Sequence, residues 1–336
     1  MLARKLKKAF CEKKNVADCE LLSSQKIKEE LESTFIHKDC VIFIGALGIA
    51  VRMVAPYLRG KEMDPALLVM DEKAEHVISV LSGHLGHANE YAKMVAKWMQ
   101  AEPVITTATD LNKKFAVDLF AEKNELRILT ISMIKEVSAR ILAGEQIPFF
   151  SELPIKGDIP NEVFVCSKEQ MLKTDAEFRE TCGIYLAKNE PKKPWKKTCQ
   201  LVPKDLIVGI GCRKGKHIDE IRAAWTKTCQ ENRLCEKRLA GVCSIDVKAQ
   251  EEGLILFARE NKVSFFTYSA EELKNLHGPF STSDFVEKQV GVDNVCERSA
   301  VMGSGNTKLL VKKTICDGIT IAIGIKERGD KEICLA

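Results

Sequence analysis

The stretch that most constrains the fold is residues 77–90. It opens with Val77 to Leu81, a short apolar run rich in β-branched residues and typical of a buried strand. Ser82 and Gly83 end this run, and beyond Gly86 apolar residues recur at helical spacing. The recurring residues are Ala88, Tyr91, Ala92, Val95 and Met99. The pattern predicts a strand that enters a helix through a turn, the repeating unit of an α/β fold.

This turn gathers side chains that carry protons or donate hydrogen bonds. Glycines let a ligand approach the backbone, and the start of a helix favours an anion. A histidine that titrates near neutral pH can act as both base and acid. The predicted catalytic residues are Ser82, His84, His87 and Glu90. The predicted substrate-binding residues of the turn are Gly83, Gly86 and Asn89.

Three other interpretations of the turn stay open. Two histidines and a glutamate on the first turn of a helix often form only a solvated face, where acidic groups complement the helix dipole. His84 and His87 are three residues apart and could bind zinc, although no cysteine or acidic ligand stands at zinc-site spacing. Ser82 could be a nucleophile, although the Gly-x-Ser-x-Gly elbow that exposes such a serine is missing.

Composition narrows the class of protein. A chain of 336 residues predicts two or three domains, and contents of 45% hydrophobic and 29% charged residues are those of a globular protein. The net charge of +4 argues against a nucleic-acid partner and is compatible with an acidic small molecule. Scattered cysteines, 13 in all, argue against a disulfide framework. No apolar run reaches about 18 residues, so we expect a cytoplasmic protein that does not cross a membrane.

The first domain, residues 1–118, is predicted to be α/β, and like the third domain it should have a mainly parallel or mixed sheet flanked by helices. An apolar strand at 41–44 is followed by Gly45 and Gly48, an arrangement that suits a carboxylate or phosphate. As a fingerprint the pair is weak, because it lacks the third glycine of a dinucleotide site and the lysine of a P-loop. Arg52, one turn into the next helix, is either a carboxylate clamp or a surface charge.

A further strand at 103–106 ends in a cluster of polar residues that includes Thr107 and Asp110. The ends of strands line the ligand crevice in open α/β sheets, so both are candidates for substrate binding. Asp110 is equally consistent with a plain N-cap of the helix over 115–120.

The rest of the chain predicts two more α/β domains. Residues 119–203 form a small middle domain that ends in a charged, proline-punctuated linker at 188–197. Residues 204–336 form the third, whose first strand ends in glycines, Arg213 and Lys214 before a helix. This repeats the design of the first domain and makes a second anion-binding loop plausible; the alternative is a tight turn carrying surface charge.

Several of these blocks, in this order, resemble the cobalamin biosynthesis protein G family (CbiG), the cobalt-precorrin-5A hydrolases. The blocks are residues 77–90, 106–110 with 115–118, 209–213, 244–248 and 291–297. The resemblance runs from about Val41 to Ile325, and it is weakest in the middle segment. On its strength the substrate-binding candidates also include Gly211, Arg213, Asp246, Lys248, Asp293 and Asn294.

The resemblance implies a three-domain enzyme of the anaerobic route to vitamin B12. Such an enzyme opens the δ-lactone of cobalt-precorrin-5A, releases acetaldehyde and gives cobalt-precorrin-5B. Cobalt would arrive inside the substrate, so no cofactor or protein-bound metal is expected. The implied partners are the corrinoid substrate and the neighbouring methyltransferases of the pathway. Family members usually have an apolar strand ahead of the first helix, so either this chain starts late or its sheet lacks an edge strand.

Two other classes of function stay open. The protein could be a non-catalytic tetrapyrrole carrier that hands intermediates between methyltransferases. It could also be an α/β esterase that uses Ser82. Binding without turnover would indicate the carrier, and labelling by a serine-directed phosphonate would indicate the esterase.

Overall fold

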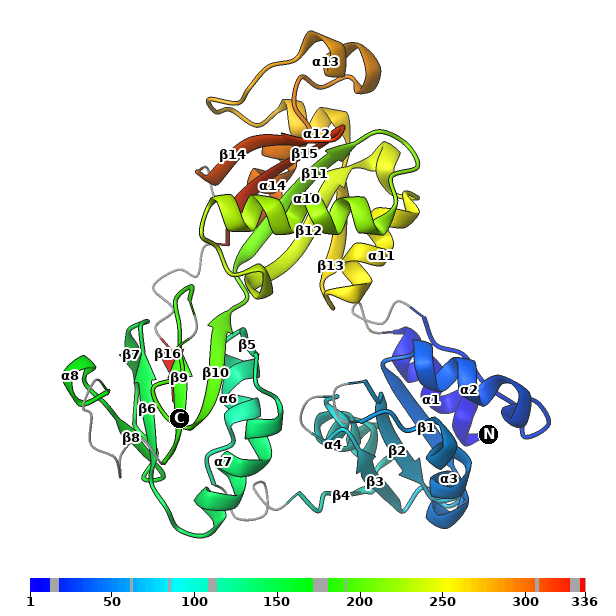
Figure 1. Cartoon of the computed structure of the whole chain (residues 1–336). Helices are drawn as coiled ribbons and strands as arrows, with labels where there is room; N and C mark the ends of the chain where they lie inside the picture. The colour runs from blue at the N-terminus through cyan, green and yellow to red at the C-terminus, as the bar shows by residue number, and fades with distance from the viewer. Residues whose placement is uncertain are drawn as a thin grey trace. The chain divides into compact units, whose positions relative to one another are not determined.

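The computed structural model (Figure 1) describes residues 1–12, 18–60, 63–83, 86–107, 114–171, 181–190, 192–305, 308–326 and 333–335. The chain divides into two compact units, residues 1–119 with 138–145 and residues 120–137 with 146–336. Both units are α/β, as the sequence predicts. Within the described ranges, no helix combines the length and apolarity needed to span a membrane.

The sheet of the first unit is mixed. Its order is β1 (Cys40–Ile44), β2 (Ala66–Met70), β3 (His76–Leu81) and β4 (Glu102–Val104). Strands β1 and β2 are parallel, β3 runs antiparallel to β2, and β4 is parallel to β3. The reversal follows from Asp71, whose carboxylate accepts the backbone N–H groups of Lys73, Glu75 and His76 and so closes a tight turn. The sheet is therefore mixed, which is one of the two arrangements that the sequence predicts.

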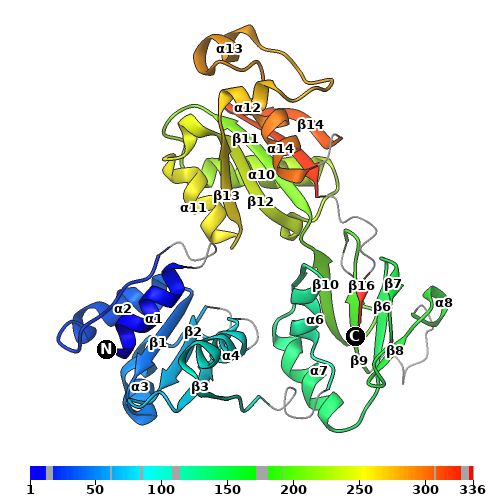
Figure 2. The same cartoon turned by 180° about the vertical axis from the view of Figure 1, so that it is seen from behind.

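Helices cover both faces of this sheet. They are α1 (Leu2–Cys11), α2 (Ile27–His37), α3 (Leu47–Val54), followed by the short η1 (Ala55–Tyr57), and α4 (Ala88–Met99). Leu68 of β2 packs with α1 and α4, whereas Leu67 packs with α2 and α3. Alternate residues of a strand point to opposite faces, so α4 and α3 lie on opposite sides of the sheet, as Figures 1 and 2 show.

The second unit contains two larger sheets. The first has the order β5 (Leu126–Ile128), β10 (Lys197–Pro203), β9 (Cys182–Leu186), β6 (Ile147–Ser151) and β8 (Val163–Val165). Nearby helices are α6 (Val117–Lys123), α7 (Ser132–Leu142) and α8 (Lys168–Met171). Beside it, β7 (Ile155–Lys156) pairs with β16 (Ile333–Cys334), so the end of the predicted third domain returns to the middle one.

The predicted linker at 188–197 packs within the middle domain. Trp195 is only 1% exposed and belongs to a buried cluster with Tyr185 and Val202. Its ring occupies the space beside Gly183, where an added Cβ would lie 2.3 Å from the Trp195 Cδ2 atom. Burial of one large indole outweighs the polar composition around it, so the predicted linker contributes to the core of the middle domain.

The last sheet has the order β13 (Ser264–Tyr268), β12 (Leu239–Ile245), β11 (Leu206–Cys212), β15 (Ile319–Ile325) and β14 (Leu309–Cys316). Strands β11 to β13 are parallel, and β14 and β15 form the predicted hairpin. Two helices, α10 (Ile218–Glu231) and α11 (Glu252–Glu260), contribute to the core cluster on one face, and α14 (Cys296–Ser304) packs on the other. Two short helices, α12 (Ala270–Lys274) and α13 (Asp284–Val290), precede α14.

A buried ion pair joins the last two sheets. Arg238 donates from Nε and Nη2 to the two carboxylate oxygens of Asp205, and both distances are 2.9 Å. Both residues are 4% exposed. Asn189 of the middle domain accepts from Arg238 Nη1 at 3.3 Å. Arg127 of β5 donates to the carbonyl oxygens of Leu239 and Asn261, at 3.2 and 3.0 Å. These contacts fasten the start of the third domain to the middle domain.

Candidate functional site

The backbone of the turn after β3 is fixed by its own hydrogen bonds. Ser82 and His87 adopt left-handed conformations, with φ of 57° and 62°, which costs a residue other than glycine about 1–2 kcal/mol. The carbonyl of Ser82 accepts the N–H groups of Gly86 and Ala88, both at 3.1 Å, and these bonds offset the strain. His84, one of the predicted catalytic residues, lies outside the described residues.

Asn89 connects the turn to the neighbouring strands. Its side chain is 4% exposed, accepts a hydrogen bond from Ser79 Oγ at 2.7 Å and donates to Thr107 Oγ1 at 3.1 Å. An added Cβ on Gly83 would lie 3.0 Å from Asn89 Oδ1 and 3.2 Å from Thr107 Oγ1. The structure thus brings together Gly83, Asn89 and Thr107, while Asp110 lies outside the described part of the chain. Ser79 escaped the sequence prediction because it sits within an apolar strand.

His87 and Glu90 form the more exposed side of the turn. Nδ1 of His87 lies 3.5 Å from Oε2 of Glu90, with 42% and 65% of the two side chains exposed. His87 occupies the N-cap position of α4 without a capping bond from its side chain, and its ring meets that of Tyr91 edge-on, with ring centroids 6.2 Å apart. An imidazole with a carboxylate at this distance and access to solvent can exchange a proton with a bound substrate or with water.

Ser82 has a hydrogen bond that holds the turn in place. Its hydroxyl donates to the carbonyl oxygen of Asp64 at 2.9 Å. An added Cβ on Gly86 would come within 2.5 Å of the Ser82 Cβ, so the turn requires a glycine there. The carboxylate of Asp64 accepts the N–H groups of Arg59 and Gly60, at 2.7 and 3.1 Å. Asp64 was missed from the sequence, although an aspartate before a proline often bonds to nearby backbone.

Gly45 lies at the opposite edge of the first sheet from this turn. Its N–H donates to the carbonyl of Met70 at the end of β2, whereas Ser82 lies beside Asp64, before the start of β2. The five residues of β2 separate these edges by about 15 Å, at about 3.3 Å per residue. Gly48 and Arg52 are exposed on α3, which runs back toward the edge that carries Ser82.

In the third domain, Glu251 organises the loop after β11. Its carboxylate accepts the N–H of Gly215 at 2.5 Å and pairs with Lys248 Nζ at 2.9 Å. Burial opposes ionisation of Glu251, but its bonds to Lys248 and to the Gly215 N–H outweigh burial and lower its pKa. Lys248 is therefore engaged by a neighbour, whereas Arg213 is exposed. The sequence did not single out Glu251.

Gly211 lies near the end of β11, and Asp246 follows the end of β12. An added Cβ on Gly211 would be 2.7 Å from Thr320 Oγ1 of β15. Its neighbour Gly209 allows α14 to approach, since a Cβ there would be 1.9 Å from the carbonyl oxygen of Cys296. The glycines thus serve packing of the sheet. Asp246 is exposed and accepts the N–H of Val247 at 2.7 Å.

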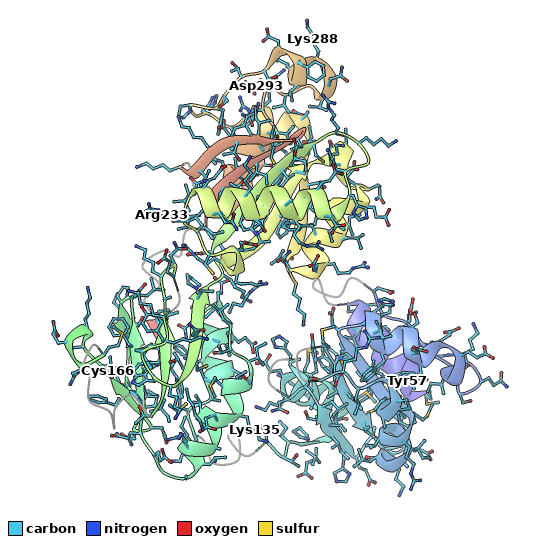
Figure 3. The ribbon with its side chains drawn as sticks, viewed as in Figure 1. Tyr57, Lys135, Cys166, Arg233, Lys288 and Asp293 are labelled. Atoms are coloured by element: carbon cyan, nitrogen blue, oxygen red, sulfur yellow. The ribbon has the colours of Figure 1, made fainter. Side chains whose placement is uncertain are left out.

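Asp293 and Asn294 stabilise the segment before α14 (Figure 3, where Asp293 is labelled). Asp293 pairs with Arg298, whose Nε lies 2.8 Å from Oδ1. Asn294 is 2% exposed, and its Nδ2 donates to the Ser281 carbonyl and to Glu297 Oε2, both at 2.9 Å. These bonds give both residues a structural role. The sequence pattern alone did not distinguish this role from substrate binding.

The fold and the turn define the class of protein: a multidomain α/β protein with a polar strand-to-helix turn suited to proton transfer. Three family models match the chain in succession. They are Cobalamin synthesis G N-terminal over residues 29–110, the Cobalamin biosynthesis central region over 115–203, and Cobalamin synthesis G C-terminus over 206–324.

Two curated relatives match nearly the whole chain. The cobalt-precorrin-5A hydrolase of Priestia megaterium is 33% identical and covers 90% of this chain and 82% of its own. The enzyme of the same name from Salmonella typhimurium is 31% identical, with 90% of each chain covered. A solved structure of a cobalamin biosynthesis protein G homolog from Sulfolobus solfataricus is 26% identical over 90% of this chain and 91% of that one, with a TM-score of 0.37. The chain belongs to the cobalamin biosynthesis protein G family, which confirms the resemblance found in its motifs.

Proposed function

We propose that this chain is a hydrolase of cobalamin biosynthesis that acts on cobalt-precorrin-5A. Its reaction would open the δ-lactone, release the two-carbon fragment as acetaldehyde and leave cobalt-precorrin-5B. The observation that carries the proposal is the 33% identity to a cobalt-precorrin-5A hydrolase over 312 residues. That alignment covers 90% of the chain, so it reaches well beyond any single domain.

The turn after β3 offers candidates for the proton transfers of lactone hydrolysis. The reaction requires a base for water, donors for the developing oxyanion and an acid for the leaving oxygen. We assign the base to His87, with Glu90 orienting it at 3.5 Å, and we keep His84 as the alternative. Asn89 holds the turn against β3 and Thr107 through its two side-chain bonds. Ser82, whose hydroxyl bonds to a backbone carbonyl, would position the turn.

The decisive experiment is an anaerobic incubation of the purified protein with cobalt-precorrin-5A. We expect acetaldehyde to accumulate in step with loss of the corresponding mass from the corrinoid. Binding without either change would instead indicate a carrier that hands intermediates to the neighbouring methyltransferases. Contact with those methyltransferases is part of the proposal, and co-sedimentation with each of them tests it.

We propose that Arg213 of the third domain binds a carboxylate of the substrate. Arg213→Ala should weaken binding by about 1.5–3 kcal/mol, the range for a hydrogen bond to a charged group. The loss should shrink as salt rises, because exposed charges are screened. Titrations at low and high salt measure both effects. Lys237→Ala is the matched control, since Lys237 is exposed near the other end of the parallel strands. Equal affinity for Arg213→Ala and the wild type at both salt concentrations would contradict the assignment.

We also propose that the reaction needs no metal bound by the protein, because the substrate carries its own cobalt. The sequence has no cysteines at metal-ligand spacing, and burial raises the pKa of Cys40 and of Cys243 to about 12, which disfavours the thiolate form that binds metals. Activity should therefore survive dialysis against a chelator that leaves corrinoid cobalt in place. Activity that is lost on dialysis and restored by zinc would show the opposite.

A further inference from the structure

The outer side of α3 is apolar and exposed. Leu47 and Val51 lie four residues apart on this side and are 41% and 43% exposed, and Leu58, just beyond η1, is 45% exposed. The opposite side of the helix carries Ala50 and Val54, which are 0% and 3% exposed in the core. A surface helix usually presents polar side chains to water, so a helix that is apolar on both sides indicates a ligand or partner on the outer one.

Two arginines border this surface. Arg52 is exposed on α3 and Arg59 is exposed just beyond η1. Neither side chain has an ion-pair or hydrogen-bond partner among the described residues; only the backbone N–H of Arg59 is engaged, by Asp64. We call Leu47, Val51, Leu58, Arg52 and Arg59 together the α3 surface.

Asp64 ties the end of the α3 surface to the turn that holds the candidate catalytic groups. Its carboxylate accepts the N–H groups of Arg59 and Gly60, at 2.7 and 3.1 Å. Its carbonyl oxygen accepts the hydroxyl of Ser82 at 2.9 Å. One residue therefore holds the backbone at Arg59 and the turn at Ser82 in a fixed relation within the same unit.

We propose that the α3 surface binds one face of the corrinoid macrocycle, with Arg52 and Arg59 pairing with its peripheral carboxylates. The inference rests on the proposed function and adds the place where the substrate lies. A corrinoid combines a broad apolar ring with a rim of anions, which matches an apolar strip bordered by cations. A second copy of this chain fits less well, because a two-fold contact across this surface would bring like-charged arginines together.

Equilibrium binding of cobyrinic acid, a stable cobalt corrinoid with free carboxylates, tests the surface without requiring turnover. Val51→Asp should weaken binding about tenfold or more, because it places an unpaired carboxylate against the apolar ring and beside the anionic rim of the corrinoid. Leu21→Asp is the matched control, since Leu21 is also 43% exposed but lies outside α3. Arg52→Gln with Arg59→Gln should weaken binding and reduce its dependence on salt. Circular dichroism of each variant checks folding.

The outcomes separate this inference from the proposed function. Weak binding by Val51→Asp, with wild-type binding by Leu21→Asp, supports the α3 surface even if the wild type releases no acetaldehyde. Wild-type affinity in Val51→Asp and in the double arginine variant overturns it, even if turnover of cobalt-precorrin-5A is normal. A change in sedimentation of Val51→Asp without a change in corrinoid affinity also overturns it, and assigns the surface to a second copy.

Discussion

His87→Ala is expected to lower the rate of acetaldehyde release by about 10²–10⁴-fold, the usual contribution of a general acid or base. His87 lies on the exposed side of the turn, with Glu90 at 3.5 Å. Its backbone φ is 62°, which alanine tolerates poorly and asparagine tolerates well. His87→Asn is therefore the sharper variant, because it removes the proton carrier while keeping the left-handed backbone. Single-turnover rates under anaerobic conditions measure the effect.

Two comparisons make the His87 result interpretable. His37→Ala changes another exposed histidine, at the end of α2, and should leave the rate unchanged. Glu90→Gln should reduce the rate less than loss of the imidazole does, since it removes only the orienting charge. A near-normal rate in His87→Asn would remove His87 from the proton transfers and leave His84 as the candidate in the turn.

Arg238→Ala should lower the free energy of unfolding of the second unit by about 3–5 kcal/mol, because it leaves the buried carboxylate of Asp205 without its partner. Urea unfolding followed by tryptophan fluorescence reports this change, since Trp195 and Trp225 are buried within the unit. The matched control is Arg222→Ala, which breaks an exposed pair with Glu260 and should cost at most about 1 kcal/mol.

A double variant tests the cause of this loss. Replacing both members, Arg238→Met with Asp205→Leu, removes the unpaired charge together with its partner. Much of the stability lost in Arg238→Ala should then return, because apolar replacements of buried pairs are often neutral or better. Equal losses in Arg238→Ala and Arg222→Ala would show that the buried pair contributes no more than an exposed one.

Local patterns predicted the elements well, because strands and helices follow from the spacing of apolar residues. The strand over 77–81 and the helix after Gly86 lie where the sequence placed them. The direction of each strand was harder to predict. The tight turn at Asp71 reverses the chain through side-chain bonds that the apolar pattern does not encode. The first sheet is therefore mixed, and Gly45 lies at the edge away from Ser82.

Only part of the candidate site could be predicted, because the sequence shows which residues are neighbours along the chain and not which ones folding brings together. Residues close in sequence to the turn, such as Asn89, stood out by their chemical types. Asp64 and Glu251 did not, because each acts through bonds to backbone groups that only the folded chain brings near. Asp293 differs from these two: the family resemblance made it a candidate for binding, and in the structure its carboxylate pairs with Arg298, five residues away.

The pair between Arg238 and Asp205 also bears on where this gene can be divided. The family models for the central and C-terminal regions match residues 115–203 and 206–324, so Asp205 falls between them. A fragment designed from those boundaries, beginning at residue 206, would lose Asp205 and leave the guanidinium of Arg238 buried without its carboxylate. Expression of the C-terminal region alone would then yield a protein that is less stable because of where the chain was cut. The cut would have to fall upstream of Asp205, and a fragment that also keeps Asn189 and Arg127 would preserve the contacts of the joined sheets.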